Sequence, residues 1–152
     1  MKALSRTPIY EMEYSPNPIR KVLSAGYIGD FPYLIMNFGH HPCCYIGVPE
    51  NHTYWGKAYD EVNLDVHGYC TFSEQAHNAL TFDFIPPKYW VLGWDYGHFN
   101  DFSGIYLYEH DRLLPFYERE RKKKKWTIKE LLKDVEQAAL QLDTSKWMRA
   151  YE

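Results

Sequence analysis

The clearest pattern of hydrophobic positions lies near the C-terminus. Between residues 128 and 142 apolar side chains recur every three or four residues, and they are Ile128, Leu131, Leu132, Val135, Ala138, Ala139 and Leu142. This spacing is typical of a helix with one apolar face. Thr127 and Glu130 match a capping box, in which each side chain satisfies a backbone N–H group at the helix start. The pattern therefore predicts an amphipathic helix that begins at Thr127 and packs on a sheet.

Short segments rich in aromatic and β-branched residues, bounded by Gly, Pro and Asn, predict strands. The predicted strands are Tyr33 to Phe38, Cys43 to Val48, Leu64 to Phe72, Tyr89 to Trp94 and Gly104 to Tyr108. Because no long amphipathic helix connects them, antiparallel pairing is favoured over parallel crossovers. The sequence thus predicts a single α+β domain over residues 1–152, with a mainly antiparallel sheet covered by the C-terminal helix.

A shorter helix is predicted near the N-terminus. Its signals are an N-cap, a proline at the first helical position, apolar positions and a terminating glycine, namely Asn17, Pro18, Ile19, Val22, Leu23 and Gly26. The connections at 49–63 and 73–88 are long for a compact domain, and loops of this length are often functional. Both connections are therefore candidate parts of a site.

Composition narrows the class of protein. Of the 152 residues, 45% are hydrophobic, 24% charged and 18% aromatic, which is the composition of one globular domain. The apolar runs are far shorter than the roughly 20 residues that span a bilayer, and no apolar block follows the N-terminus. We therefore expect a soluble, unexported protein. Three cysteines, an odd number, suit free thiols in a reducing compartment.

Charge is distributed unevenly along the chain. Residues 26–111 contain two basic and eleven acidic residues, a balance of −9, whereas the overall net charge is −3. Phosphate binding by Lys and Arg alone is therefore not expected in this stretch. The one basic run, residues 119–125, is interpreted as a solvated linker before the C-terminal helix, although it could also contact a polyanion.

Two groups of histidine and carboxylate residues could carry chemistry. Asp65 and His67 occupy positions i and i+2 of a predicted strand and should share one face, while Asp95, His98 and Asp101 follow another strand. Imidazole with carboxylates suits zinc, manganese or iron, and the same groups could perform acid–base chemistry. Hydrogen-bonded structural histidines are the alternative for each. We expect Asp65, His67, Asp95 and His98 to face one pocket.

The loop at 49–63 offers a possible ligand wall. Tyr54 and Trp55 could stack on a planar group, and Lys57 could meet a phosphate. We expect the two aromatic side chains to form part of the rim of the pocket. The alternative is that Trp55 closes the edge of the core and Lys57 is solvated.

A cluster at His40, His41, Cys43 and Cys44 contains four potential metal ligands. Adjacent residues of a strand face opposite sides, so at most His41 with Cys43, or His40 with Cys44, could converge. Two buried cysteines acting as small apolar residues are favoured over a structural zinc site or a catalytic thiol.

The segments CYIGVPENHTYWGKAYDEVNLDVHG, TFS and GWDYGHFND resemble a group of small proteins encoded by bacteriophages and prophages. The resemblance is strongest at 54–60, 65–68 and 93–101. Its members tend to carry a second glycine after the one matching Gly68, where this chain has Tyr69. The resemblance implies a phage origin and assigns no catalytic residue.

The leading hypothesis is a phage-type protein that acts by binding in the cytoplasm of the bacterial host. It would counteract host defence by sequestering a nucleotide-like signal or inhibiting a defence protein. Candidate ligand-binding residues are Tyr54, Trp55, Lys57, Asp65, His67, Asp95 and His98. No cofactor is favoured, and neither a membrane nor direct nucleic-acid binding is expected.

Two alternatives stay open. One is a divalent-metal-dependent hydrolase or phosphodiesterase, with Asp65, His67, Asp95, His98 and Asp101 as ligands or acid–base groups. No spacing matches a known catalytic motif. The other is an acidic mimic of nucleic acid that blocks a basic groove of a host protein.

Overall fold

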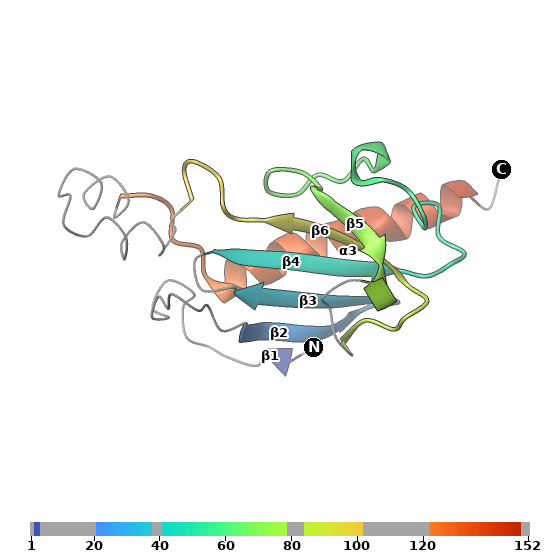
Figure 1. Ribbon diagram of the computed structural model, residues 1–152, viewed down its shortest axis with the longest axis horizontal. Coiled ribbons are helices and arrows are strands. Elements are labelled where there is room, and N and C mark those ends of the chain that lie inside the picture. Colours follow the sequence, from blue (N-terminus) through green and yellow to red (C-terminus); the bar gives the residue numbers. More distant parts are fainter. Residues whose placement is uncertain (1, 4–20, 38–40, 79–83, 102–121, 150–152) are drawn as a thin grey trace.

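The computed structural model describes residues 2–3, 21–37, 41–78, 84–101 and 122–149, with side chains described as far as residue 144 (Figure 1). The strands are β1 (Lys2–Ala3), β2 (Lys21–Ile28), β3 (Phe31–Asn37), β4 (Pro42–Val48), β5 (Phe72–Gln75) and β6 (Trp90–Asp95). The helices are two single 3₁₀ turns, η2 (Tyr59–Glu61) and η3 (Ala76–Asn78), and the long α3 (Ile128–Arg149).

The strands form one six-stranded sheet in the order β1-β2-β3-β4-β6-β5. Every neighbouring pair is antiparallel, and α3 lies across one face of the sheet (Figure 1). The predicted α+β class is thus confirmed. Because β6 runs antiparallel to β4, the end of β6 lies beside the start of β4, where Asp95 pairs with Cys43. Residues 96–101 follow from this end of the sheet.

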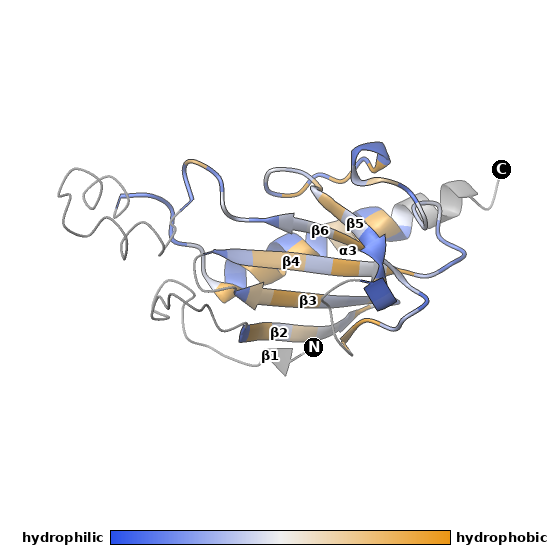
Figure 2. Cartoon of the chain, in the orientation of Figure 1, coloured by the Kyte–Doolittle hydropathy of each residue, from blue (hydrophilic) through white to orange (hydrophobic). Residues whose placement is uncertain are grey.

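The main core lies between the sheet and α3. Inward-facing residues of the central strands pack against the apolar stripe of α3; they include Tyr33, Ile35, Ile46, Leu92, Trp94, Leu131, Val135, Ala138 and Leu142. On the other face a smaller cluster contains Ala76, Ile85 and Val91. All residues of β3 are buried, and Figure 2 shows hydrophobic positions concentrated on the central strands.

The capping box predicted for α3 is confirmed. The backbone N–H of Glu130 donates to Thr127 Oγ1 at 3.2 Å, and the backbone N–H of Thr127 donates to Glu130 Oε1 at 3.0 Å. The other Glu130 oxygen accepts from Lys124 Nζ at 2.6 Å. This cap fixes where α3 begins, next to the end of the 99–101 segment, because Lys124 bridges to Asp101.

Thr127→Ala is expected to lower the free energy of unfolding by about 1 kcal/mol, because the orphan N–H groups of the first turn lose their partner. Urea denaturation measures the change. Thr144→Ala is the matched control, since the Thr144 hydroxyl donates to the carbonyl of Leu140 within the helix and caps nothing. Its effect should stay within about 0.5 kcal/mol. Equal losses in the two variants would contradict a capping role.

The predicted N-terminal helix is wrong at residues 21–26. These residues belong to β2, where Gly26 pairs with Tyr33 and Lys21 with Asn37. Local capping signals are worth little against a full ladder of hydrogen bonds to β3, so tertiary pairing decides the conformation. Residues 17–20, which carry the proposed cap, lie outside the described residues.

Three predicted strands are confirmed to within two residues as β3, β4 and β6. The strand predicted at 64–72 is wrong, because only Phe72 belongs to a strand, β5. Residues 62–67 still alternate between buried and exposed positions, as a strand would. The left-handed backbone of Gly68 (φ 67°) and Tyr69 (φ 63°) interrupts the segment before β5. The strand predicted at 104–108 lies outside the described residues.

The described end of the basic run is not simply a solvated linker. Lys123 Nζ lies 4.9 Å from the centroid of the Phe99 ring, and Lys124 Nζ lies 4.9 Å from that of Trp126. The Lys124 N–H donates to the carbonyl of Asn100 at 3.0 Å. These contacts hold the approach to α3 against residues 99–101. In the part of the chain described here, no helix combines the length and apolarity needed to cross a membrane.

Candidate functional site

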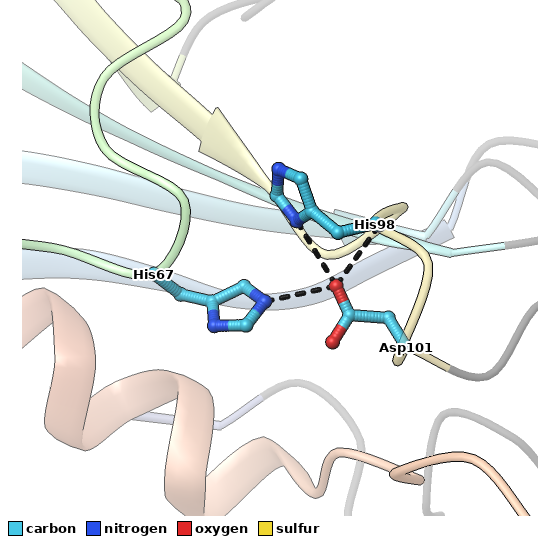
Figure 3. A group of neighbouring side chains, drawn as sticks. All are labelled: His67, His98 and Asp101. Carbon is cyan, nitrogen blue, oxygen red and sulfur yellow. Dashed lines mark hydrogen bonds and ion pairs between the residues drawn. The ribbon is translucent and has the colours of Figure 1, made fainter.

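Asp101 forms the centre of a cluster of polar side chains. It is 3% exposed, and its Oδ2 lies 2.8 Å from His67 Nε2 and 3.0 Å from His98 Nδ1 (Figure 3). The backbone N–H of His98 also donates to Oδ2 at 3.0 Å, and Trp126 Nε1–H donates to Oδ1 at 2.8 Å. One buried carboxylate therefore joins the turn at 67, the loop after β6 and the start of α3.

The protonation state of Asp101 follows from these contacts. Burial raises the pKa of the carboxyl, but hydrogen bonds from His67, Trp126 and the backbone of His98 outweigh burial and leave the pKa lowered. The ionised carboxylate is only an acceptor. In their neutral forms, His67 must then carry its proton on Nε2 and His98 on Nδ1. The lone pairs of His67 Nδ1 and His98 Nε2 are left directed away from Asp101 (Figure 3).

The His67 ring is held on several sides. It stacks on Tyr96 with centroids 4.8 Å apart and planes within 1°, and the Trp126 ring lies 4.7 Å away at 59°. His98 meets its face edge-on at 5.1 Å. These contacts restrict the imidazole to one orientation, so that binding at its outer nitrogen would cost little ordering entropy.

Asp134 of α3 forms hydrogen bonds to the residues that surround His67. Its Oδ2 accepts hydrogen bonds from the Tyr96 hydroxyl, from Trp94 Nε1 at 3.2 Å and from the backbone N–H of His67 at 3.2 Å. Burial raises the pKa of Tyr96, which keeps this hydroxyl protonated as a donor to Asp134. The network connects β6, the 65–67 segment and α3.

A second side chain of α3 fixes the backbone before His67. Gln141 Oε1 accepts from the N–H of Asp65 at 2.7 Å, and Gln141 Nε2 donates to the carbonyl of Asp65 at 2.9 Å. The amide thus replaces the ladder partner that this extended segment lacks. The segment is consequently rigid without being a strand of the sheet.

An open groove of about 610 Å³ lies between this segment and α3. It is lined by residues 65–67, by Trp126 and by the side chains of α3 from Glu130 to Gln141. Its lining contains three carboxylates, those of Asp65, Glu130 and Asp134, and one lysine, Lys133, and the carboxylate of Glu130 is paired with Lys124 Nζ at 2.6 Å. The groove is therefore polar and negatively charged, and His67 links it to the Asp101 cluster.

Gly68 is required by the closeness of His98. A Cβ atom at this position would lie 2.3 Å from Cε1 and 2.5 Å from Nε2 of the His98 ring, and the backbone has φ 67°. The next residue, Tyr69, has φ 63° and is 70% exposed. Tyr69 thus has a backbone conformation that glycine favours.

The structure brings together several of the predicted site residues. His67 and His98 are in contact, and Asp65 lines the groove beside His67. Asp95 Oδ1 lies 3.9 Å from His98 Nε2 and accepts the N–H of Gly97 at 3.0 Å. Asp101, predicted from the sequence as a metal ligand or acid–base group of the hydrolase alternative, is the residue that connects the two histidines.

The predicted aromatic rim is wrong. The Trp55 ring lies 5.8 Å from that of Trp90, at the start of β6, whereas His98 follows the end of this strand. Trp55 Nε1 donates to the carbonyl of Lys88, and the carbonyl of Lys57 accepts from Trp90 Nε1. The loop folds back on the start of β6, so Tyr54, Trp55 and Lys57 do not line the groove.

Trp126 and Asp134 are site residues that the sequence reasoning missed. A signal for Asp134 was present, because it follows Leu131 by three residues and so interrupts the apolar stripe with a charge. Trp126 directly precedes the capping residue, where an apolar side chain commonly packs on the first turn. Neither position indicated which partner it would meet across the fold.

His52 is a buried histidine with a structural role. It is 1% exposed, its Nε2 lies 2.7 Å from the carbonyl of Leu142, and its Nδ1 accepts the N–H of Tyr54 at 3.0 Å. Both ring nitrogens are therefore used in fixing the 49–55 loop to α3. His67 differs because only one of its nitrogens faces Asp101.

All three cysteines are buried and unpaired, as the odd count predicts. His41 Nδ1 lies 3.9 Å from Cys43 Sγ, but Cys44 points to Tyr96 instead, with its Sγ 3.9 Å from the hydroxyl. Within the described residues, the group with metal-binding geometry is the one at Asp101 and does not include these thiols. Burial raises the pKa of Cys43 to about 12 and raises those of Cys44 and Cys70, so the thiols are not activated as nucleophiles.

Native protein at pH 8 is expected to resist alkylation by iodoacetamide at all three cysteines, because the reactive thiolate is scarce and each sulfur is buried. In urea the same thiols should react fully. Mass spectrometry counts the adducts in both states. Rapid labelling of native Cys43 would contradict this and would revive the catalytic-thiol alternative.

Comparison of the chain with models of protein families, with curated proteins and with solved structures found no match.

Proposed function

We propose that this protein binds a small polar ligand in the groove beside α3, with His67 as the anchoring side chain. The observation that carries the proposal is that a groove of about 610 Å³ opens directly onto an imidazole held in one orientation. Small-molecule sites commonly have volumes of about 300–1,000 Å³ and are largely formed before the ligand arrives.

Both walls of the groove are rigid. On one side, Gln141 and Asp134 hydrogen-bond the backbone of residues 65–67. On the other, α3 is anchored by its cap and by its apolar stripe in the core. A ligand would therefore lose little affinity to ordering of the protein, which is the general advantage of a preorganised site.

The side chains of the groove favour a ligand with several hydrogen-bonding groups. Lys133 and Gln137 offer donors, Asp65 and Gln137 offer acceptors, and His67 Nδ1 accepts in the tautomer derived above. This chemistry is compatible with the sugar and base of a nucleotide-like molecule. We propose sequestration of such a molecule, in a phage protein that counteracts host defence, as the biological role.

A panel of linear and cyclic nucleotides, titrated into the protein by isothermal calorimetry, tests the proposal. We expect one panel member to bind with one site per chain. Gln137→Trp should block the groove and abolish this binding. Leu140→Trp is the matched control, because Leu140 is 63% exposed on the same helix and does not line the groove. No heat across the panel, or equal binding by Gln137→Trp, would overturn the proposed site.

Hydrolysis is the second candidate function, and the sharing of Asp101 by two imidazoles favours it. The carboxylate fixes both tautomers and leaves two outer nitrogens that can accept or return a proton, which is the arrangement of a general base. Turnover of a chromogenic phosphodiester that is lost in His98→Ala but retained in His77→Ala would support it. Absence of turnover by the wild-type protein would count against hydrolysis.

A further inference from the structure

The cluster at Asp101 places too many donors on one oxygen. Oδ2 receives His67 Nε2 at 2.8 Å, His98 Nδ1 at 3.0 Å and the backbone N–H of His98 at 3.0 Å. A carboxylate oxygen has about two lone-pair directions, so it cannot accept three hydrogen bonds with good geometry. Oδ1, by contrast, receives only Trp126 Nε1 among the described partners.

A metal ion would resolve this conflict. It would accept electron pairs from both imidazole nitrogens and from Oδ2, leaving the backbone N–H as the second partner of that oxygen. One ligand atom from each of His67, His98 and Asp101 lies within 4.8 Å of the others (Figure 3). Two ligands about 2.1 Å from a metal and at right angles are about 3 Å apart. The two nitrogen–oxygen distances, 2.8 and 3.0 Å, fit this separation, while the two imidazole nitrogens, which lie within 4.8 Å of each other, must be no more than about 4.2 Å apart to share one ion.

We infer that His67, His98 and Asp101 bind one divalent transition-metal ion, and that this ion receives an anionic group of the ligand in the groove. The first half depends only on the cluster. The second half rests on the proposed function.

The donor set selects the class of metal. Two imidazoles with one carboxylate suit a borderline ion such as Zn²⁺, and the carboxylate together with water would also admit Mn²⁺, whereas Mg²⁺ and Ca²⁺ prefer all-oxygen ligands. Three protein ligands leave coordination positions for water or a ligand. The side chains of His67 and His98 are 28% and 41% exposed, so these positions are open to solvent even though Asp101 is buried.

Metal binding needs no net loss of protons. Each neutral imidazole moves its proton from the nitrogen facing Asp101 to its other ring nitrogen, and the freed lone pair binds the ion. With the ion bound, His67 Nδ1 therefore donates to a ligand in the groove, whereas in the metal-free protein it accepts. For His98 the proton then faces Asp95, whose Oδ1 lies 3.9 Å from Nε2. Carboxylates commonly support metal-binding histidines in this way. Trp126 orients Asp101 by holding Oδ1.

The charge of the groove explains why an anionic ligand would need the ion. Glu130 is paired with Lys124, but the carboxylates of Asp65 and Asp134 still outnumber Lys133, so a phosphate would meet repulsion from the groove itself. A divalent cation on His67 would add positive charge beside the groove, because His67 is the one of its three ligands that also lines the groove. The metal would therefore decide whether nucleotide-like molecules can bind.

The test begins with protein freed of metal by a chelator and then dialysed. Calorimetric titration with ZnCl₂ and with MnCl₂ should show one site per chain for at least one ion. His67→Ala and His98→Ala should each weaken binding at least tenfold. His77→Ala, which removes an exposed histidine outside the cluster, is the matched control and should bind like the wild type. Circular dichroism establishes which variants are folded. If His67→Ala does not fold, the result for His98→Ala decides the test, because His98 lies on an exposed turn.

NMR of the imidazole nitrogens adds a readout that a structural role would not move. On saturation with Zn²⁺, the protonated nitrogen of His98 should change from Nδ1 to Nε2. Absence of zinc and manganese binding by the wild type, or unchanged affinity in folded His98→Ala, would overturn the metal site.

Inorganic phosphate is the probe for the second half of the inference. It should bind the metal-loaded protein at least tenfold more tightly than the metal-free protein. Equal affinity would overturn the role of the ion in anion binding. The proposed function fails separately, because metal binding with no binding of any nucleotide would contradict the groove as a nucleotide site and leave the metal site standing.

Discussion

Asp101→Asn is expected to lower the free energy of unfolding by about 2–4 kcal/mol, although the two side chains have nearly the same shape. Oδ2 accepts the backbone N–H of His98, and Oδ1 accepts Trp126 Nε1–H. Both partners are donors that cannot accept. Whichever way the asparagine amide is turned, its NH₂ group meets one of them in a site only 3% exposed. Urea denaturation in the presence of a chelator isolates this effect from metal binding.

Two further variants make this prediction sharper. Asp65→Asn changes an exposed carboxylate of the groove and should alter stability by less than about 0.5 kcal/mol. In a Trp126→Phe background, the indole donor is absent and the asparagine NH₂ has room to face that side. The cost of Asp101→Asn should then be smaller than in the wild type, which a double-mutant cycle measures. Strict additivity would contradict the donor conflict.

The same carboxylate predicts a dependence on pH. The pKa of Asp101 in the folded protein lies below its ordinary value of 3.8. Its stabilising contribution is therefore fully present above the unfolded value and is lost as the pH falls through the lower, folded value. The difference in stability between metal-free wild type and Asp101→Asn should shrink as the pH falls below about 4. A difference that did not shrink below about pH 4 would contradict an ionised Asp101.

The fold was predictable where the spacing of the hydrophobic residues and the local capping or turn residues indicate the same element. The C-terminal helix, its capping box and the three central strands have strong patterns that burial in one core enforces. At 21–26 the local signals favoured a helix, but pairing with β3 depends on partners distant in sequence. At 64–67 the alternation was real, yet Gln141 took the place of a neighbouring strand. Alternation of apolar and polar residues indicates that one side of a segment is buried. It does not indicate which element forms hydrogen bonds with the backbone of that segment.

The site was predictable in part for the same reason. Alternation places Asp65 and His67 on one side of the chain, and a turn after β6 carries His98 and Asp101 together. The partners across the fold were not predictable, because Asp134 and Trp126 reach the site through the path of α3. The aromatic loop failed as a rim because nothing local determines the end of β6 on which a long connection packs.

Gly68→Ala is the substitution expected to disrupt the site most directly while leaving its ligands in place. The added Cβ would lie 2.3–2.5 Å from atoms of the His98 ring, far inside contact distance, so the ring must move away from Asp101. The left-handed backbone adds roughly 1–2 kcal/mol for any L-residue. We expect a total loss of stability of about 2–4 kcal/mol, from this strain together with a weakened charge-assisted hydrogen bond.

Gly56→Ala separates these two contributions. Gly56 also has a left-handed backbone, with φ 80°, but a Cβ there has nothing within 4 Å. It should therefore show the backbone cost of about 1–2 kcal/mol alone and keep the wild-type NMR shifts of the His98 ring. Gly68→Ala should show the larger loss and a shifted His98 resonance. Equal losses, with His98 undisturbed in both, would mean that the ring can move aside without leaving Asp101, and that the glycine serves only the turn.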